Sequence, residues 1–305
     1  MKKFKEILFL RNLKGVGKKT IYRDYWAKLN DSDDFYDFVS EVELTHKFTT
    51  DEIKESIFLA QESYDHISTS DIEVITVFDD DYPKQLEIMG NNRPLILYIK
   101  GDAEILKRPN IAIIGTRKPS KLSEEFEANL VKSILDSSGR VIISGLALGC
   151  DKIAHQTTVD ENKPTIAILP SGVNVIKPAK HKRLAQEIID TGGCLISEYE
   201  PNKTPYKQEY IDRDKIVAAF SDATLVVECG VKSGTMHTVN FADTYDKQVY
   251  AYLPNEKPDG LYDGNEYILK EKKGAIRVED ISKFLVDLDN LKTKKKIVSV
   301  QQTLF

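Results

Sequence analysis

Short apolar runs alternate with segments of helical spacing along most of this chain, and this alternation constrains the fold more than any other feature. After the apolar run Ile111–Gly115, the spacing of Leu122, Phe126 and Leu130 places them on one face of a helix that we expect near residues 120–136. The alternation predicts an α/β fold, with a doubly wound, mostly parallel sheet and helices on both faces. The runs expected as strands are Ile111–Gly115, Val141–Ser144, Thr165–Leu169, Cys194–Tyr199, Ala223–Glu228 and Val249–Leu253.

Glycine and hydroxyl residues follow four apolar runs, directly or one short loop later. The stretches are Ile111–Arg117, Ser144–Asp151, Thr165–Gly172 and Ser233–Thr238. Parallel strands end at one edge of a sheet, where free N–H groups at the start of the next helix hold anions. Glycines that merely turn the chain are the alternative, but several such loops on one edge favour a ligand crevice. The expected phosphate-binding pocket is lined by Gly115, Thr116, Arg117, Ser144, Gly145, Gly149, Ser171, Gly172, Ser233, Gly234 and Thr235.

The pattern divides the chain into three parts. Residues 1–70 carry helical spacing and predict a small helical domain. Within it, Leu13–Thr20 resembles a helix-hairpin-helix turn whose amides could approach a nucleic-acid phosphate, and an ordinary helix connection is the equal alternative. Residues 71–286 form the Rossmann-like part, which begins with strand-like runs at Val74–Phe78 and Leu95–Ile99. Residues 287–305 are expected to be a flexible basic tail.

Composition indicates a globular protein of the cytoplasm. The 305 residues contain no apolar stretch near the roughly 20 residues that a membrane span needs, and Glu6 and Arg11 interrupt the basic start, which makes it a poor secretory signal. The three cysteines form no Cys-x-x-Cys pair and the five histidines are scattered, so we expect neither a metal nor a cofactor. A net charge of −5 argues against a surface coated for nucleic-acid binding but leaves room for a local basic groove.

The motifs, taken in order over residues 74–254, resemble the DNA-processing protein A family (DprA/Smf). This resemblance implies an extended Rossmann fold, a homodimer, binding of single-stranded DNA and delivery of the RecA recombinase, with no enzymatic activity. It also implies that Arg117 grips a DNA phosphate, since a guanidinium can hold two phosphate oxygens at once. A surface ion pair is the alternative for Arg117. The motifs are Tyr82–Leu86, Tyr98–Gly101, Ile111–Arg117, Ser144–Asp151, Ala154–His155, Thr165–Gly172, Ile196–Glu198 and Val226–Thr238.

The chain departs from that family at two phosphate-binding loops. Leu148 stands where the family usually has an arginine, and Arg213–Lys215 reads Arg-Asp-Lys where the family has Arg-Asn-Arg. One cation is lost, a second becomes lysine, and the carboxylate of Asp214 would repel a phosphate. We therefore expect weaker DNA binding with a shallower salt dependence. Arg117 and Lys215 are the leading phosphate contacts, with Arg213 and Lys232 behind them.

Two other functions stay open on these residues. Weakened DNA contacts make a smaller ligand credible, so a nucleotide-sensing module, for instance in a defence system, is one alternative. Nucleotide phosphoribohydrolases of the wider superfamily carry a loop similar to Glu228–Thr235 and are the other. Met236 and His237 stand where such hydrolases carry a glutamate, which disfavours hydrolysis.

The last five residues, Gln301–Phe305, resemble the short peptide by which bacterial replication and repair proteins dock on the sliding clamp. Leu304 and Phe305 would fill an apolar pocket while Gln301 hydrogen-bonds at its rim, and the lysine-rich segment before them supplies reach. Folding of Leu304 and Phe305 back onto the sheet is the alternative. The sliding clamp is therefore a candidate partner.

Overall fold

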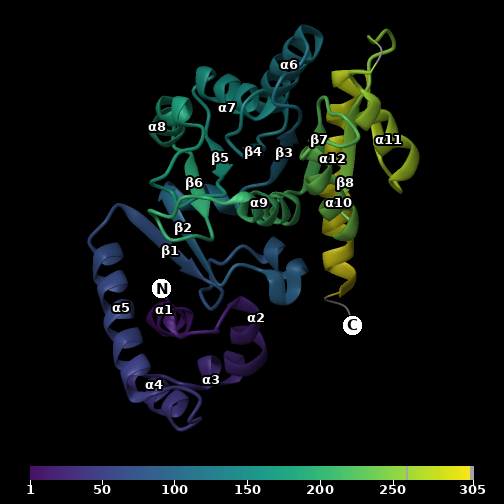
Figure 1. Ribbon diagram of the computed structural model, residues 1–305. Helices are drawn as coiled ribbons and strands as arrows, with labels where there is room; N and C mark the ends of the chain where they lie inside the picture. Colours follow the sequence, from purple (N-terminus) through teal and green to yellow (C-terminus); the bar gives the residue numbers. More distant parts are fainter. Residues whose placement is uncertain (259, 303–305) are drawn as a thin grey trace.

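The computed structural model describes residues 1–258 and 260–302, with side chains as far as Leu291 in the last helix (Figure 1). Within these residues, nine strands form one sheet in the order β1-β2-β6-β5-β4-β3-β7-β8-β9. The strands are β1 (Ile72–Thr76), β2 (Ile96–Gly101), β3 (Asn110–Ile114), β4 (Val141–Ser144), β5 (Thr165–Ile168), β6 (Cys194–Ser197), β7 (Ala223–Val226), β8 (Gln248–Tyr252) and β9 (Ile276–Val278).

The sheet reverses its chain order between β3 and β7. From β3 the chain moves outward through β4, β5 and β6, and from β7 it moves the opposite way through β8 and β9. These strands are parallel, whereas β2 is antiparallel to both of its neighbours, β1 and β6. Ala112 of β3 lies opposite both Ile143 and Thr224, so β3, β4 and β7 end together. Such a reversal point is where doubly wound sheets bind their ligands.

Alternating side chains of the central strand β3 build a core on each face of the sheet. Ile111 and Ile113 pack in one cluster with Leu130 of α6, and Ala112 and Ile114 face the opposite cluster with α9. The helices are α1 (Phe4–Asn12), α2 (Lys18–Thr20), α3 (Trp26–Asp31), α4 (Phe35–Glu43), α5 (Thr50–Ser68), α6 (Lys121–Ser137), α7 (Cys150–Asp160), α8 (Lys182–Asp190), α9 (Lys207–Phe220), α10 (Thr235–Thr244), α11 (Asp263–Glu271) and α12 (Ile281–Gln302). Shorter turns are a π-helical turn at Ile21–Tyr25 and 3-10 helices at Lys84–Asn92, Ala103–Lys107 and Ala179–His181.

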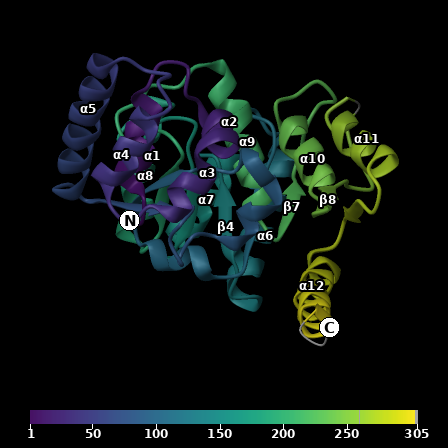
Figure 2. The ribbon, with the colours of Figure 1, turned by 90° about the horizontal axis from the view of Figure 1, so that it is seen from below.

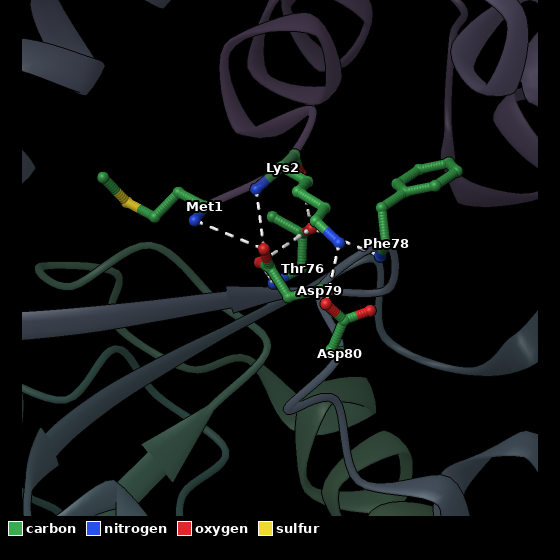
Figure 3. Close-up of polar contacts among 6 residues, drawn as sticks. All are labelled: Met1, Lys2, Thr76, Phe78, Asp79 and Asp80. Atoms are coloured by element: carbon green, nitrogen blue, oxygen red, sulfur yellow. Dashed lines mark hydrogen bonds and ion pairs between the residues drawn. The ribbon is translucent and has the colours of Figure 1, made fainter.

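Helices α1 to α5 pack beside β1 and β2 and share a hydrophobic core with them. The ring of Phe4 meets that of Tyr98 edge-on at 6.2 Å. A polar cluster joins the start of the chain to the end of β1: the Lys2 amide donates to Asp79 at 2.8 Å, and the Thr76 hydroxyl donates to the Lys2 carbonyl at 2.5 Å (Figure 3). The Met1 ammonium lies 3.3 Å from the same Asp79 carboxylate. Helices α5 and α12 lie at opposite sides of the molecule (Figure 2).

The predicted α/β class with a mostly parallel, doubly wound sheet is confirmed, and Val141–Ser144 coincides with β4. Helices α7 and α11 and strand β9 were not among the predicted elements. Helix α7 lacks an aliphatic stripe because its buried face carries residues such as Ala154, His155 and Thr158. Strand β9 has three residues, too few to show an alternating pattern.

The last part of the chain differs from the flexible tail expected at residues 287–305. Helix α12 continues to Gln302. Its first half is anchored, because Leu288 is fully buried and the ring of Phe284 meets Tyr250 edge-on at 4.9 Å. Residues 303–305 lie outside the described chain. Among the described helices, none combines the length and apolarity that a bilayer crossing requires.

Candidate functional site

A cleft of about 760 Å³ opens where the sheet reverses, at the carboxyl ends of β3 and β7. The loops after β3 and β4, the start of α10 and one face of α9 form its walls. The residues predicted from the sequence that line it are Gly115, Thr116, Arg117, Gly145, Arg213, Ser233, Gly234 and Thr235. Further lining comes from Ile114, Ala147, Asp151, Lys207, Tyr210, Ile211, Asp214, Val217, His237 and Thr238.

The loop after β3 holds Arg117 at the rim of this cleft. The Thr116 amide donates to the Glu228 carbonyl at 2.7 Å, and the Cys150 amide donates to the Thr116 carbonyl at 3.1 Å. Gly149 has φ +74°, and a Cβ atom there would overlap the backbone of Thr116 and Arg117. Only glycine therefore lets α7 begin directly beneath the loop. The Arg117 side chain is exposed, and no carboxylate of the described residues pairs with it, so the ion-pair alternative finds no partner there.

The loop after β4 contributes shape rather than free amides. The Asp151 carboxylate accepts from the amides of Gly145 at 3.1 Å and Ala147 at 3.2 Å. Burial raises the pKa of Asp151, and the positive charge of Arg213 opposes that rise. The hydroxyl of Ser144 is also occupied, since it donates to the Ile113 carbonyl at 2.7 Å. The amides of this loop thus bind a carboxylate of the protein itself.

The side chain of Arg213 forms hydrogen bonds to the protein inside the cleft. Its Nη1 donates to the carbonyls of Gly145 at 2.6 Å and Ile168 at 2.9 Å, and its Nε donates to Asp214 at 3.0 Å. The Arg213 side chain is 8% exposed. Its charge is therefore largely committed to the protein's own oxygens.

Two predicted cations lie outside the cleft lining. Lys215 pairs with Asp212 at 2.6 Å, and its ammonium lies 5.6 Å from the ring centre of Phe241. Lys232 is exposed on the loop before α10. Neither residue lines the cleft.

Sequence reasoning missed Lys207 and Tyr210, which line the cleft from the first turns of α9. Helix α9 begins at Lys207, ahead of the Arg213–Lys215 motif that the sequence singled out. The sequence signal for the start of this helix was Glu209, which follows Tyr206 by three residues, the spacing that a capping box has at a helix N-terminus. In the structure the Glu209 carboxylate accepts from the Tyr206 amide.

The start of α10 completes the cleft. The Thr235 hydroxyl donates to the Gly115 carbonyl at 3.1 Å and joins the two loops that flank the reversal point. His237, also missed from the sequence as a lining residue, is exposed there. The Glu228 side chain is buried and accepts from the amide and hydroxyl of Ser120, at 3.0 and 2.6 Å. Glu228 thus holds Ser120, the N-cap residue of α6, and does not line the cleft, which weighs against the hydrolase alternative.

Ser171 and Gly172 are not brought to the cleft. The Ser171 hydroxyl donates to the Val175 carbonyl at 2.5 Å, and the Gly172 amide donates to the Lys203 carbonyl at 2.9 Å. The physical reason is strand order, since β5 is separated from β3 by β4. The clamp-docking prediction cannot be placed: the side chain of Gln301 and all of Leu304 and Phe305 lie outside the described part of the structure.

The cysteines are buried thiols. Cys150, Cys194 and Cys229 are free, and burial raises the pKa of each, that of Cys229 to about 12. A thiol held neutral in this way is a poor nucleophile and a poor metal ligand. In residues 1–258 and 260–302, no three His, Cys, Asp or Glu side chains are grouped to hold a metal ion.

Comparison with known proteins identifies relatives over most of the chain. Residues 73–289 match the family described as DNA recombination-mediator protein A. DNA processing protein DprA of Streptococcus pneumoniae is 32% identical over 196 residues, covering 64% of this chain and 68% of that protein. Protein Smf of Escherichia coli is 30% identical over 241 residues, covering 79% of this chain and 61% of that protein. The matches therefore span roughly two thirds of the length of these relatives.

Solved structures show the same fold. The X-ray structure of DNA processing protein A from Streptococcus pneumoniae superimposes with a TM-score of 0.76 at 26% identity, covering 92% of this chain and 96% of that one. DNA processing protein A from Helicobacter pylori, described by its single-stranded DNA binding mode, superimposes with a TM-score of 0.64 at 30% identity, covering 73% of this chain and 98% of that one. The family match, the sequence identity and the shared fold agree with the motifs: this chain belongs to the DNA-processing protein A (DprA/Smf) family.

Proposed function

We propose that this protein binds single-stranded DNA in the cleft at the β3/β7 reversal and acts, without catalysis, as a recombination mediator of the DprA type. The observation that carries the proposal is Arg117, an exposed guanidinium at the rim of the cleft with no carboxylate partner among the described residues. The family description as a recombination mediator and the DNA-binding mode named for the Helicobacter pylori relative support it.

The cleft offers the two kinds of contact that single strands need. Arg117 and Lys207 are exposed cations from two different elements of the lining, the loop after β3 and α9. Tyr210 lines the cleft beside them, and Tyr206, 76% exposed, precedes Lys207. Cations track the phosphates while aromatic rings stack on bases, a combination that binds single strands without strict sequence preference.

The binding test is a fluorescence polarisation titration of a labelled oligonucleotide across a salt series. We expect Arg117→Ala to weaken binding about tenfold and to reduce the slope of log K against log salt by about 0.7, the value for one phosphate on a single strand. Lys118→Ala is the matched control, since Lys118 is the exposed neighbour and does not line the cleft. Equal affinity and slope for Arg117→Ala and the wild type would remove Arg117 from the DNA site.

The same titration separates DNA binding from nucleotide sensing. Mononucleotides that displace the oligonucleotide at low micromolar concentration would favour a nucleotide sensor. Release of free base from a nucleoside monophosphate would instead show a hydrolase. We expect neither result, because the carboxylate nearest to the hydrolase pattern, Glu228, is bound to Ser120.

The proposal includes three partners beyond DNA. Family membership supports the proposal that the protein delivers RecA to the bound strand and forms a homodimer, both in the cytoplasm. The sliding clamp follows from the peptide Gln301–Phe305. Sedimentation equilibrium tests the dimer, RecA filament nucleation on bound DNA tests the mediator role, and clamp binding by a synthetic tail peptide, with Leu304 and Phe305 replaced by alanine as control, tests docking.

A further inference from the structure

The cleft has two chemically different ends. Its rim carries the exposed cations Arg117 and Lys207, whereas the Asp214 side chain, 16% exposed, lies deeper on α9. Asp151, 7% exposed, also lines the interior. Among the described residues inside the cleft, these two carboxylates outnumber the one guanidinium, that of Arg213, whose hydrogen bonds go to the protein's own oxygens. A phosphate is therefore better placed at the rim than in the interior. A ligand that enters with its phosphate at the rim must therefore place some other group against Asp214.

The Asp214 carboxylate can accept more hydrogen bonds than the described residues donate to it. Its Oδ1 accepts from Nε of Arg213 at 3.0 Å, and no other donor of the described residues reaches the carboxylate. An ionised carboxylate has about four acceptor positions, so most of them are unfilled. Burial and the nearby charge of Asp151 raise the pKa of Asp214, while Arg213 and His237 act in the opposite direction. A buried acceptor in this condition is stabilised by any ligand that donates to it.

The surroundings of Asp214 suit a nucleobase. Tyr210 lies four residues before Asp214 on α9, and Ile211 and Val217 lie three residues before and after it. The three side chains therefore share the helix face of Asp214, and all three line the cleft. A mostly apolar wall with one oriented polar group is the usual construction of a site for a flat heterocycle.

We propose that Asp214 makes the cleft selective for a nucleobase that carries an exocyclic amino group. This inference rests on the proposed function and names the part of the DNA that the cleft prefers. The amino group of cytosine donates to a carboxylate. Thymine places a carbonyl oxygen at the corresponding position, and the partial negative charge of that oxygen is repelled by the carboxylate. The DprA/Smf pattern has an asparagine here, whose amide both donates and accepts, so the selectivity is a property of this chain's departure from its family.

The test compares the dissociation constants of cytidine and thymidine homopolymers, which differ little in stacking, at pH 8 and fixed salt. The wild type is expected to bind the cytidine oligonucleotide about tenfold more tightly, as one charged hydrogen bond implies. Asp214→Asn should bring the two constants within about twofold of each other, chiefly by improving thymidine binding. Asp212→Asn is the matched control, two residues away, paired with Lys215 and outside the cleft, and should keep the tenfold preference.

The outcomes distinguish this inference from the proposed function. Equal wild-type affinity for both oligonucleotides, with Arg117→Ala still weakening both, would overturn the base preference and leave DNA binding intact. A tenfold preference that survives in Asp214→Asn would remove Asp214 as its source. Absence of binding to either oligonucleotide would reject the proposed function itself. Asp214→Ser, checked for its thermal unfolding transition, serves if the Asn variant does not fold.

Discussion

Nη1 of Arg213 donates a hydrogen bond of 2.6 Å to the carbonyl of Gly145, and a Cβ atom on residue 145 would overlap the same guanidinium. A second bond of 2.9 Å reaches the carbonyl of Ile168. One side chain of α9 therefore ties together the ends of β4 and β5. Because Arg213 is committed in this way, Arg117 and Lys207 at the rim are the cations that the proposed DNA site has for a phosphate.

Gly145→Ala should lower the free energy of unfolding by about 2–4 kcal/mol, because the added methyl displaces a buried guanidinium and leaves two carbonyl oxygens without their charged donor. Urea denaturation measures the change. Gly230→Ala, where the space around the Cβ position is open, should stay within about 0.5 kcal/mol of the wild type. A Gly145→Ala protein as stable as the wild type would show that the guanidinium moves aside without loss.

The edge of the sheet at which the cleft lies was predictable from the sequence, but not every loop that lines it. Apolar runs followed by glycine loops indicate parallel strands ending together. Strand order is not written in that pattern, because it depends on how the helices cross over. Gly115 and Ser233 line the same cleft because β3 and β7 are neighbours, whereas Ser171, on the loop after β5, donates to a carbonyl of its own loop.

The interaction partners of each cation were harder to predict from the sequence than its occurrence in the motif. Arg213 and Lys215 are two residues apart in the sequence, yet one is buried against carbonyls and the other pairs with Asp212. Only the second pairing follows from local spacing, at i and i+3 on a helix. The two carbonyl partners of Arg213, at the ends of β4 and β5, lie 45 or more residues away in the chain, beyond the reach of any periodicity.

The buried carboxyl of Glu127 should make stability depend on pH. It is fully buried beside the Cys150 thiol, and no N–H or O–H group of the described residues reaches either oxygen. Burial raises its pKa well above the usual range, so the folded state holds a proton that the unfolded state releases. The stabilising contribution is complete below the unfolded pKa and is lost as the pH rises toward the folded pKa.

Glu127→Gln should therefore gain stability relative to the wild type as the pH rises above the ordinary glutamate pKa of about 4.3, by up to about 1.4 kcal/mol per pH unit. Unfolding free energies from urea titrations at several pH values give the slope. Glu125→Gln, an exposed neighbour on α6, should show no such trend. A constant difference between Glu127→Gln and the wild type across this range would mean that Glu127 titrates normally.

The helix-hairpin-helix-like turn should not bind DNA through Lys18. The Lys18 ammonium lies 2.7 Å from the Glu198 carboxylate, which is 11% exposed, so its charge is directed toward the sheet. Lys18→Gln should cost about 1 kcal/mol of stability and leave the salt slope of oligonucleotide binding unchanged. Glu198→Gln should cost a similar amount, and the double variant little more than either. A slope reduced by about 0.7 in Lys18→Gln would instead place Lys18 on a phosphate.

The hydrogen bonds of the buried Asn265 side chain support the loop that leads into α10, and two substitutions test their contribution to stability. Its Nδ2 lies 3.2, 3.0 and 2.8 Å from the carbonyl oxygens of Val226, Val227 and Tyr252, so its two N–H bonds are shared among three acceptors, and its Oδ1 accepts from the Cys229 amide at 2.8 Å. This fully buried side chain thus joins β7 and β8 to the loop that leads into α10. Asn265→Ala should cost about 3 kcal/mol, because it leaves these buried groups unpaired.

Asn265→Asp keeps the shape and replaces the donor by an anion that faces the same three carbonyl oxygens. We expect it to destabilise the protein at pH 7 at least as much as the alanine variant. The folded pKa of the new carboxyl would be raised by burial and by those oxygens, so the deficit should shrink as the pH falls toward 5. The alanine variant has no group to titrate at this position, and its deficit should stay constant. Chemical unfolding at the two pH values decides the matter, since parallel behaviour of the two variants would mean that the three carbonyls do not depend on Asn265 for a donor.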